Sequence, residues 1–369
     1  MTTDADSSFL ARSGPPDRGG EEGRQITPDS GVLTVPREPS QDENVRKKYE
    51  VFIVDSADVP HGEEDSIERE ILQDCADVRL VRLHSEEEFM PYSSQADAII
   101  LWHHVQFTSV LLGKLARTRL IVRNGVGYDN VDVAAAGASG IRVANVPDYG
   151  TEEVADHAIT LTLALIRQLK PLMADVSKGG WEWRAGVSCR RIRGRVFGVV
   201  GCGRIGTAAA LRAKALGFDV RFYDPYLASG YEKAIGVGRS SSLEELLPVA
   251  DVVSVHTPLT QETRHLIAGR ELTRMKNSAY LVNTARGPVV SYDALFDALS
   301  QGAIAGAGLD VLEDEPAGAT ALQQFPNCIV TPHSAFYSQE SLIEMRTKSA
   351  LIVRDALLHG RYANVVNRV

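Results

Sequence analysis

The sequence predicts an α/β protein built on two doubly wound parallel sheets. Three observations lead to this prediction. Short apolar runs typical of buried strands recur along the chain and alternate with helical segments. The chain has 369 residues, which is too long for one ordinary hydrophobic core, so two domains are expected. A glycine motif near the middle of the chain opens a second strand–helix–strand unit and divides the pattern in two.

The composition excludes several classes of protein. It is 44% hydrophobic and 24% charged, as in globular proteins. A net charge of −9 and the lack of a long basic block argue against a nucleic-acid-binding surface, and no apolar stretch is long enough to span a membrane. We therefore expect a cytoplasmic protein with reduced thiols, no metal, and neither nucleic acid nor membrane as a partner. The cysteines behind this expectation lack CxxC spacing: Cys75, Cys189, Cys202 and Cys328.

The N-terminal segment, residues 1–48, is rich in Gly, Pro, Ser and charges of both signs, with almost no apolar pattern. This composition predicts a disordered tail. The segment has no apolar core of the kind that signal peptides carry, so secretion is not indicated. An inert extension is the simpler interpretation, and a regulatory or partner-binding role stays open.

The first α/β unit begins after this tail. Strands are predicted over 50–55, 78–83, 98–102 and 120–123, with a helix over 63–72. Ligands of such sheets bind beyond the carboxyl ends of the strands. The loop Arg123-Asn124-Gly125-Val126-Gly127-Tyr128-Asp129 follows one of these ends, and its two glycines can bring backbone N–H groups together as an anion-binding nest. A plain glycine turn is the alternative.

A long helix is predicted over residues 151–169. Its side chains are apolar on nearly all sides, so it must be buried between the domains, in a dimer, or in both. An aromatic and basic segment follows, and a salt-bridged loop is the simpler interpretation of it. Binding of a second anionic group on a substrate is the alternative. The residues concerned are Trp181, Trp183, Arg184, Arg190, Arg191, Arg193 and Arg195.

The second unit opens with the apolar strand 196–200, followed by a G-x-G-x-x-G motif. Gly201 permits the tight turn from strand to helix, and Gly203 lets the backbone approach a pyrophosphate. Gly206 lets the helix pack closely on the strand. The N-terminus of the helix then presents free N–H groups and a positive dipole end to the phosphates. The motif therefore predicts dinucleotide binding.

The end of this unit indicates which dinucleotide is bound. The helix is expected to stop at Gly217, and the strand 219–223 leads to Asp224, about where a carboxylate accepts from a ribose 2′-hydroxyl. A carboxylate would repel a 2′-phosphate, and no Arg directly follows. The sequence thus favours NAD over NADP.

Further strands are predicted over 251–257, 279–283 and 304–309, which complete a second doubly wound unit. Polar residues at their ends would rim the cofactor crevice. A final helix over 341–358 is expected to return to the first domain. The predicted division is a tail at 1–48, a substrate-binding domain at 49–148 plus 334–369, and an NAD-binding domain at 149–333.

Three polar residues near these ends form a candidate catalytic set: Arg286, Glu315 and His333. Each alone is more often structural. Together they match the reduction of a 2-oxo acid, in which a guanidinium forks the carboxylate and polarises the ketone. A histidine protonates the developing alkoxide, and a carboxylate beside it orients the ring and keeps it protonated.

From residue 49 onward the chain resembles the D-isomer-specific 2-hydroxyacid dehydrogenases, closest to the branch of the C-terminal-binding proteins. The branch is indicated by the LRAKALGF and FYDPY sequences around Asp224. The motifs that carry the family resemblance are Asn124–Asp129, Gly201–Gly206 with Asp224-Pro225, His256–Leu259, Val282–Gly287, Gly308–Val311 leading to Glu315-Pro316, and Thr331–His333.

The resemblance implies a flavodoxin-like substrate domain and a Rossmann NAD-binding domain with a cleft between them, in a homodimer. It implies an NAD-dependent enzyme that produces the D-hydroxy acid. Arg286 would bind the substrate's carboxylate and carbonyl, and Glu315 would raise the pKa of His333, the general acid. The implied substrate-binding residues are Arg123, Val126, Gly127 and Phe336. The implied cofactor-binding residues are Gly201, Gly203, Arg204, Ile205, Gly206, Asp224, Thr257, Ala285 and Asp310, with Asp310 on the nicotinamide carboxamide.

The chain departs from the branch at Phe336, where the C-terminal-binding proteins have Trp, so its substrate need not be theirs. An NAD-sensing, corepressor-like binding protein is the alternative from another class. We favour the enzyme, because no long polar tail follows His333 and the N-terminal tail has no obvious docking motif. A phosphonate- or phosphite-specialised dehydrogenase also stays open. Glu315 stands where formate dehydrogenases carry Gln, which argues against formate.

Overall fold

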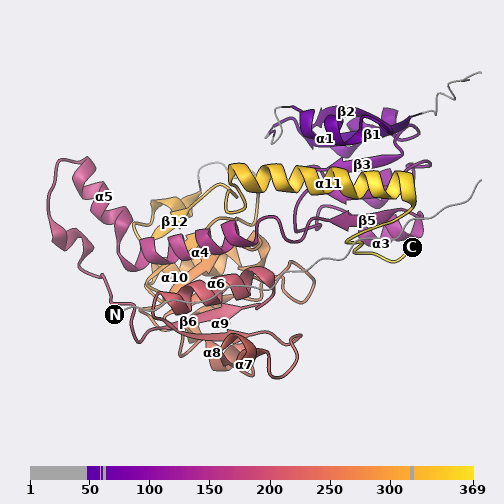
Figure 1. The fold of residues 1–369 in the computed structure, drawn as a ribbon. Coiled ribbons are helices and arrows are strands. Elements are labelled where there is room, and N and C mark those ends of the chain that lie inside the picture. Colours follow the sequence, from indigo (N-terminus) through magenta and orange to yellow (C-terminus); the bar gives the residue numbers. More distant parts are fainter. Residues whose placement is uncertain (1–47, 59, 61–63, 316–319) are drawn as a thin grey trace, which may run out of the picture. The chain divides into compact units, whose positions relative to one another are not determined.

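The computed structural model describes residues 48–58, 60, 64–315 and 320–369, which belong to one compact unit (Figure 1). The predicted disordered tail at 1–48 lies outside the described residues except for Lys48. So does Glu63, where the first helix was expected to begin. Within the described ranges, no helix is long and apolar enough to cross a membrane.

The first sheet has five parallel strands in the order β2-β1-β3-β4-β5. The central strands β3 and β4 are completely buried, because helices cover both faces, whereas the edge strand β2 has exposed residues. The order reverses direction between β1 and β3, which is the flavodoxin-like arrangement. The strands are β1 (Tyr49–Ser56), β2 (Ala76–Leu83), β3 (Ala98–Leu101), β4 (Leu120–Arg123) and β5 (Arg142–Asn145).

The helical elements of this half include the last helix of the chain. As expected, α11 packs against α1, β3 and β4, and Figure 1 shows it alongside this sheet. A buried ion pair joins the two helices, since Arg346 of α11 donates to both carboxylate oxygens of Glu68 at 2.8 and 2.6 Å. The elements are α1 (Ser66–Leu72), η1 (Glu86–Tyr92), α2 (Ser109–Leu112), α3 (Val133–Ala138) and α11 (Gln339–His359).

The second sheet has seven parallel strands in the order β12-β11-β10-β9-β6-β7-β8. The order reverses direction between β6 and β9, beside the glycine motif that follows β6. The two sheets confirm the predicted α/β class with two doubly wound parallel sheets. The strands are β6 (Val196–Val200), β7 (Asp219–Tyr223), β8 (Gly238–Arg239), β9 (Val252–Val255), β10 (Tyr280–Asn283), β11 (Gly306–Leu309) and β12 (Cys328–Val330).

The helices around the second sheet include α6, which follows the glycine motif and packs on α4. It ends where the sequence predicts, at Gly217, whose φ of +93° is the left-handed conformation that glycine adopts most readily. The elements are α4 (Thr151–Ile166), α5 (Leu169–Ser177), η2 (Trp183–Gly186), α6 (Arg204–Ala215), α7 (Tyr231–Ile235), α8 (Leu243–Leu246), α9 (Gly269–Arg274), η3 (Gly287–Val289), α10 (Tyr292–Ser300) and η4 (Ala321–Gln324).

The single helix predicted over 151–169 is wrong at its C-terminal end. Helix α4 stops at Ile166, and Gln168 turns the chain through a left-handed conformation, with φ +53°, before α5 begins. Pro171 explains the break, because proline has no N–H to bond the carbonyl four residues earlier in a continuous helix. In the first turn of α5 the same proline costs nothing. As expected, α4 is buried along much of its length.

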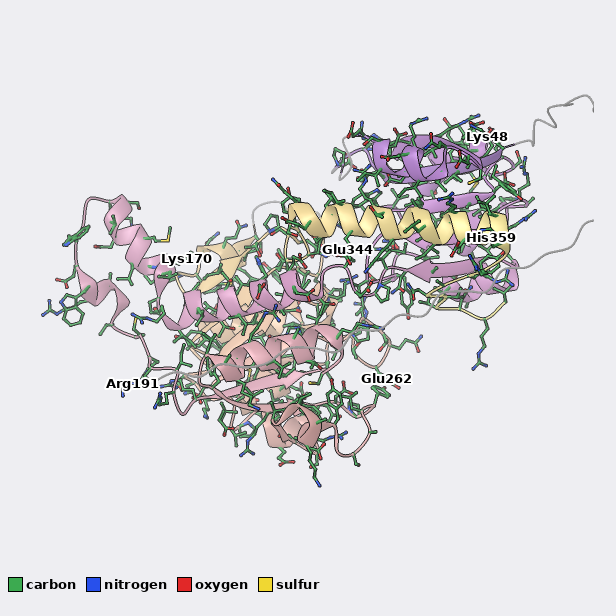
Figure 2. All side chains as sticks on the ribbon, in the orientation of Figure 1. Lys48, Lys170, Arg191, Glu262, Glu344 and His359 are labelled. Atoms are coloured by element: carbon green, nitrogen blue, oxygen red, sulfur yellow. The ribbon has the colours of Figure 1, made fainter. Side chains whose placement is uncertain are left out.

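The start of α5 is fixed to the second sheet. Lys170 donates to the carbonyl oxygens of Gln323, Phe325 and Cys328 at 3.0, 2.8 and 2.7 Å. Figure 2 labels this side chain at the base of the helix. Three carbonyls in hydrogen-bond reach satisfy all three ammonium protons. The remainder of α5 and the segment after it have little contact with the sheet, and no residue of α5 is buried.

Candidate active site

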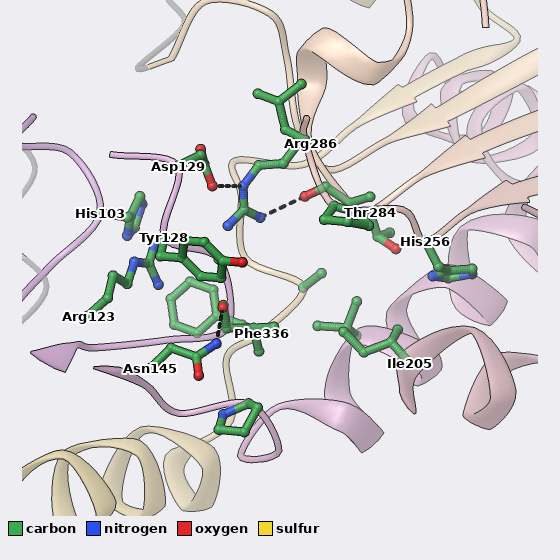
Figure 3. Close-up of a pocket in the computed structure, with 18 of the residues that line it drawn as sticks. His103, Arg123, Tyr128, Asp129, Asn145, Ile205, His256, Thr284, Arg286 and Phe336 are labelled. Carbon is green, nitrogen blue, oxygen red and sulfur yellow. Dashed lines mark hydrogen bonds and ion pairs between the residues drawn. The ribbon is translucent and has the colours of Figure 1, made fainter. Parts of the chain in front are cut away.

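A pocket of about 450 Å³ lies beyond the carboxyl ends of strands from both sheets (Figure 3). The first sheet contributes Arg123 at the end of β4, Val126 and Gly127 in the loop that follows it, and His103 after β3. The second sheet contributes residues after β6, β9, β10 and β11. Parallel strands direct their following loops to the same edge, so each loop reaches the pocket for the same topological reason.

Arg286 follows β10 and extends to the loop after β4. Its Nε donates to Asp129 Oδ1 at 2.9 Å, and its Nη1 donates to the Ala285 carbonyl at 2.8 Å (Figure 3). Gly127 makes this approach possible, because a Cβ there would lie 1.6 Å from Arg286 Nη2. Burial alone would raise the pKa of Asp129, but the charge and hydrogen bond of Arg286 hold it below its usual range. The guanidinium is thereby fixed beside the Gly125–Gly127 backbone.

Arg123 is a second guanidinium beneath the same loop. It is 6% exposed, and Nη1 donates to the Asn124 carbonyl at 3.0 Å, while Nε is buried without a partner among the described residues. Burial, together with the charge of Arg286, lowers its pKa to about 10, so it stays protonated at neutral pH. It forms no ion pair with a described residue. A buried cation in this state favours an anionic ligand.

His333 and Glu315 form a close pair, with Nδ1 and Oε2 2.5 Å apart. Glu315 Oε1 also accepts from the Leu312 N–H at 2.7 Å. Burial would raise the pKa of Glu315, but the hydrogen bond and charge of His333, helped by Leu312 and Arg286, hold it below its usual range. The carboxylate of Glu315 therefore contacts Nδ1 of the His333 ring, and Nε2 remains available for proton transfer in the pocket.

The backbone holds His333 in a rarely populated conformation. Its φ is +49°, in the left-handed region that is unfavourable for a residue with a Cβ. The buried carboxylate of Asp310 stabilises this turn by accepting from the Ser334 and Ala335 N–H groups at 3.0 and 2.9 Å and from the Thr331 hydroxyl at 2.6 Å. Asp310 lines the pocket, as the sequence predicts. Its carboxylate binds the loop that carries His333, a contact that the sequence does not predict.

The glycine motif adopts the geometry that its residue types predict. Gly201 has φ +85°, and Gly203 precedes the first turn of α6. A Cβ on Gly206 would lie 2.1 Å from the Gly201 carbonyl oxygen, so only glycine allows this packing. Asp224 accepts from the Cys202 N–H at 2.9 Å, which draws the end of β7 to the turn.

The residues of this half fit a bound dinucleotide. Three buried polar atoms lack partners within the described part of the chain: His256 Nδ1, Thr257 Oγ1 and Thr284 Oγ1. All three residues line the pocket. Burial lowers the pKa of His256 to about 4, so its ring is neutral at physiological pH. The ribose hydroxyls and the amide group of a dinucleotide can form hydrogen bonds with such atoms.

Most of the predicted site residues meet at this pocket, and residues that the sequence did not single out also line it, His103, Asp129 and Tyr149 among them. The described ranges contain no cluster of His, Cys, Asp or Glu that could hold a metal ion. The predicted residues in the lining are Arg123, Val126, Gly127, Gly203, Arg204, Ile205, Thr257, Ala285, Arg286, Asp310, His333 and Phe336. The predicted residues Gly201, Gly206, Asp224 and Glu315 are not part of the lining, and Glu315 reaches it through its contact with His333.

The arginines of residues 184–195 are absent from this lining. Arg184 instead pairs with Glu182 at 3.2 Å, and Arg195 with Asp251 at 2.9 Å. The salt-bridged interpretation of this segment therefore applies to these two residues. The lining of this pocket gives no support to the alternative, a second anion site formed by this cluster.

Residues 159–335 match the model of a protein family described as "D-isomer specific 2-hydroxyacid dehydrogenase, NAD binding domain". The chain is 34% identical over 304 residues to a D-3-phosphoglycerate dehydrogenase of Methanocaldococcus jannaschii, covering 82% of this chain and 57% of that protein. It is 34% identical over 310 residues to C-terminal-binding protein 1 of Caenorhabditis elegans, covering 81% of this chain and 42% of that protein. The chain thus spans about half the length of these two relatives.

Among solved structures, a D-lactate dehydrogenase of Aquifex aeolicus complexed with NAD and lactic acid is similar to this chain. The TM-score is 0.76 and the identity 31%, with 86% of this chain and 98% of the other covered. The match extends over both sheets, whereas the family model covers mainly the second. By the description of that model, the segment 159–335 is an NAD-binding domain.

Proposed function

Since the chain belongs to the D-isomer-specific 2-hydroxyacid dehydrogenase family, we propose that it reduces a small 2-oxo acid to the D-2-hydroxy acid with NADH. One observation carries this proposal: Arg286 and the His333–Glu315 pair converge on one pocket, next to the N-terminus of α6. A guanidinium, an imidazole with a bonded carboxylate, and a phosphate-binding turn are the groups that this reaction requires.

Each residue has one task in the proposed reaction. Arg286 holds the substrate carboxylate and polarises the ketone, with the Val126 and Gly127 N–H groups and Arg123 on the carboxylate's other side. His333 donates the proton on Nε2 to the ketone oxygen as negative charge develops there. Glu315 keeps Nδ1 bonded, so the ring stays oriented toward the ketone. In the reverse direction His333 accepts the proton.

NADH, when bound, supplies the hydride that reduces the carbonyl carbon. Arg204 and Ile205, at the start of α6, are proposed to meet the pyrophosphate through their N–H groups, and Asp224 the adenine ribose. Thr257 and Thr284 have hydroxyls without partners in the described chain, and these are proposed to bond the cofactor. Asp310 is proposed to act chiefly by holding the loop that carries His333.

The two sheets support the predicted division into a substrate-binding domain, 49–148 plus 334–369, and an NAD-binding domain, 149–333.

We also propose a homodimer. The segment after α4 exposes large apolar side chains, with Met173, Trp181 and Trp183 at 69, 91 and 71% exposure. Such surfaces are typical of contacts between proteins. Light scattering of the purified chain tests the dimer, and a monomer at micromolar concentration would contradict it.

We further propose a cytoplasmic location, because the four cysteines are free thiols.

The experiment that tests the function is steady-state kinetics with NADH or NADPH and a panel of 2-oxo acids, with chiral analysis of the product. NADH-dependent turnover to the D-hydroxy acid is expected. Tight NADH binding without turnover of any member would favour the corepressor-like alternative instead.

A further inference from the structure

We propose, on the basis of the function proposed above, that the substrate is a 2-oxo monocarboxylic acid with an apolar side chain, branched aliphatic or aryl, beyond the ketone. Phe336, Trp102, Tyr149 and Met345 would enclose this side chain. The inference distinguishes apolar monocarboxylates from glyoxylate and pyruvate, which have little or no side chain, and from dicarboxylates and phosphorylated acids.

The substrate end of the pocket carries one unbalanced positive charge. The positive charge of Arg286 and the negative charge of Asp129 both act on the pKa of Arg123, in opposite directions. His333 is paired with Glu315. One positive charge, that of Arg123, is therefore left without a counterion among these groups. A single carboxylate balances it, and a second anionic group would bring an uncompensated negative charge into a partly buried site.

The wall of the pocket beside His333 is aromatic and apolar. The Phe336 ring packs edge-on against the rings of His333, His103 and Tyr149, each with centroids 6.4 Å away. Behind it, Trp102 and Met345 are 2 and 1% exposed. These side chains belong to the hydrophobic cluster on which Phe336 packs, so the wall continues the core of the first sheet.

The polar atoms near this wall face the carboxylate end of the pocket. Asn145 donates to the Val126 carbonyl at 2.6 Å. The hydroxyl of Tyr149 lies at the Gly125 backbone, while its ring faces Phe336. No Lys lines the pocket. The wall therefore presents mainly apolar atoms, and little charge, to the part of the substrate beyond the ketone.

His103 also packs on Phe336, and its ring lies 4.9 Å from that of His333. This contact places a flat ring beside Phe336 and His333, and it extends the aromatic wall of the pocket.

The test is kcat/KM for NADH-dependent reduction of three pairs of acids. They are 4-methyl-2-oxopentanoate and phenylpyruvate, then pyruvate and glyoxylate, then 2-oxoglutarate and oxaloacetate. Burial of one methylene is worth roughly a fourfold change in rate. The apolar pair should therefore exceed both other pairs by about 10-fold or more. A preference for pyruvate, glyoxylate or a dicarboxylate would overturn the inference and leave the proposed function standing. No turnover of any acid would overturn both.

A variant then locates the preference. Phe336→Ala should lower the ratio of kcat/KM for 4-methyl-2-oxopentanoate over pyruvate by about 10-fold, with Phe336→Leu in between. Tyr337→Ala is the matched control, because Tyr337 is the next residue, is 56% exposed, and is absent from the pocket lining. An unchanged ratio in a folded Phe336→Ala protein would contradict the assignment of this wall.

Discussion

Arg286 and Asp129 are joined by a 2.9 Å hydrogen bond from Nε to Oδ1, and this bond connects the loop after β10 with the loop after β4. The two residues are far apart in the sequence and come from different sheets. In this contact Nη2 lies so close to Gly127 that a Cβ on residue 127 would overlap it, at 1.6 Å. The geometry of the site therefore depends on an ion pair as well as on the two folds.

Replacing Arg286 by Lys tests the need for a forked donor. Lysine keeps the charge but cannot hold a carboxylate and a carbonyl with two parallel N–H groups. We expect Arg286→Lys to lower kcat/KM on the order of 100-fold, with NADH affinity nearly unchanged by fluorescence titration. Asp129→Asn, which keeps an acceptor near Nε, should lose about 10-fold. A fully active Arg286→Lys protein would exclude the forked contact.

Gly127→Ala tests the close approach of Arg286 to the loop. The added Cβ would lie 1.6 Å from Nη2, so the guanidinium must move out of place. Steady-state kinetics should show a loss of about 10-fold or more in kcat/KM. Gly269→Ala is the control, because nothing lies within 4 Å of its Cβ position and its φ is not positive. Equal activity of the two variants would mean that Arg286 tolerates displacement.

The pKa of Glu315 predicts a pH dependence. Its folded-state pKa lies below 4.5, the ordinary value, so the pair with His333 adds stability above about pH 4.5. This stability is lost as the pH falls through the lowered pKa. Thermal unfolding of wild type and Glu315→Gln should therefore differ at neutral pH and converge in acid. The same variant should lower kcat on the order of 100-fold at neutral pH. A difference that grew in acid would reverse the assigned sign.

Asp224→Ala tests the choice of cofactor. Loss of the carboxylate removes the proposed ribose contact, so the Kd for NADH should rise about 10-fold while that for NADPH rises less. Asp224 also accepts from the Cys202 and Tyr226 N–H groups, so Asp224→Asn serves as the variant that retains an acceptor. An unchanged Kd for NADH in Asp224→Ala would remove this residue from the cofactor site.

The buried pair of Glu68 and Arg346 predicts a stability effect outside the site. Their side chains are 1 and 9% exposed, and removal of one charge leaves the other buried and unpaired. Glu68→Gln should lower the free energy of unfolding by about 3 kcal/mol in urea titrations. Arg69→Ala, which breaks an exposed pair with Asp65, should change it by less than about 1 kcal/mol. Similar effects from both variants would contradict this ranking.

Much of the fold follows from the sequence because its central strands are continuous apolar runs. The predicted bounds of β4, β6 and β7 match the structure. The short strands β5, β8 and β12 were not predicted, since a few residues at a sheet's edge carry little periodic signal. The break between α4 and α5 was missed although Pro171 marked it.

The site was predictable where chemistry constrains residue type. Arg286, Glu315 and His333 are recognisable because the reaction needs such groups, and the structure brings them together. His103 could not be found in this way. Two adjacent histidines after an apolar run form no motif, and the contact with His333 depends on how the loops after β3 and β12 meet. Asp129 stood in a recognised loop, but only the position of Arg286 shows its partner.

The role of His333 as the general acid can be tested by comparing wild type with His333→Asn. Both proteins are mixed with NADH and 4-methyl-2-oxopentanoate, and NADH absorbance is followed while NADH binding is measured separately by fluorescence. We predict that wild type oxidises NADH and forms the D-hydroxy acid, and that His333→Asn binds NADH with similar affinity but turns over at least about 100-fold more slowly. Full turnover by His333→Asn would exclude His333 as the general acid.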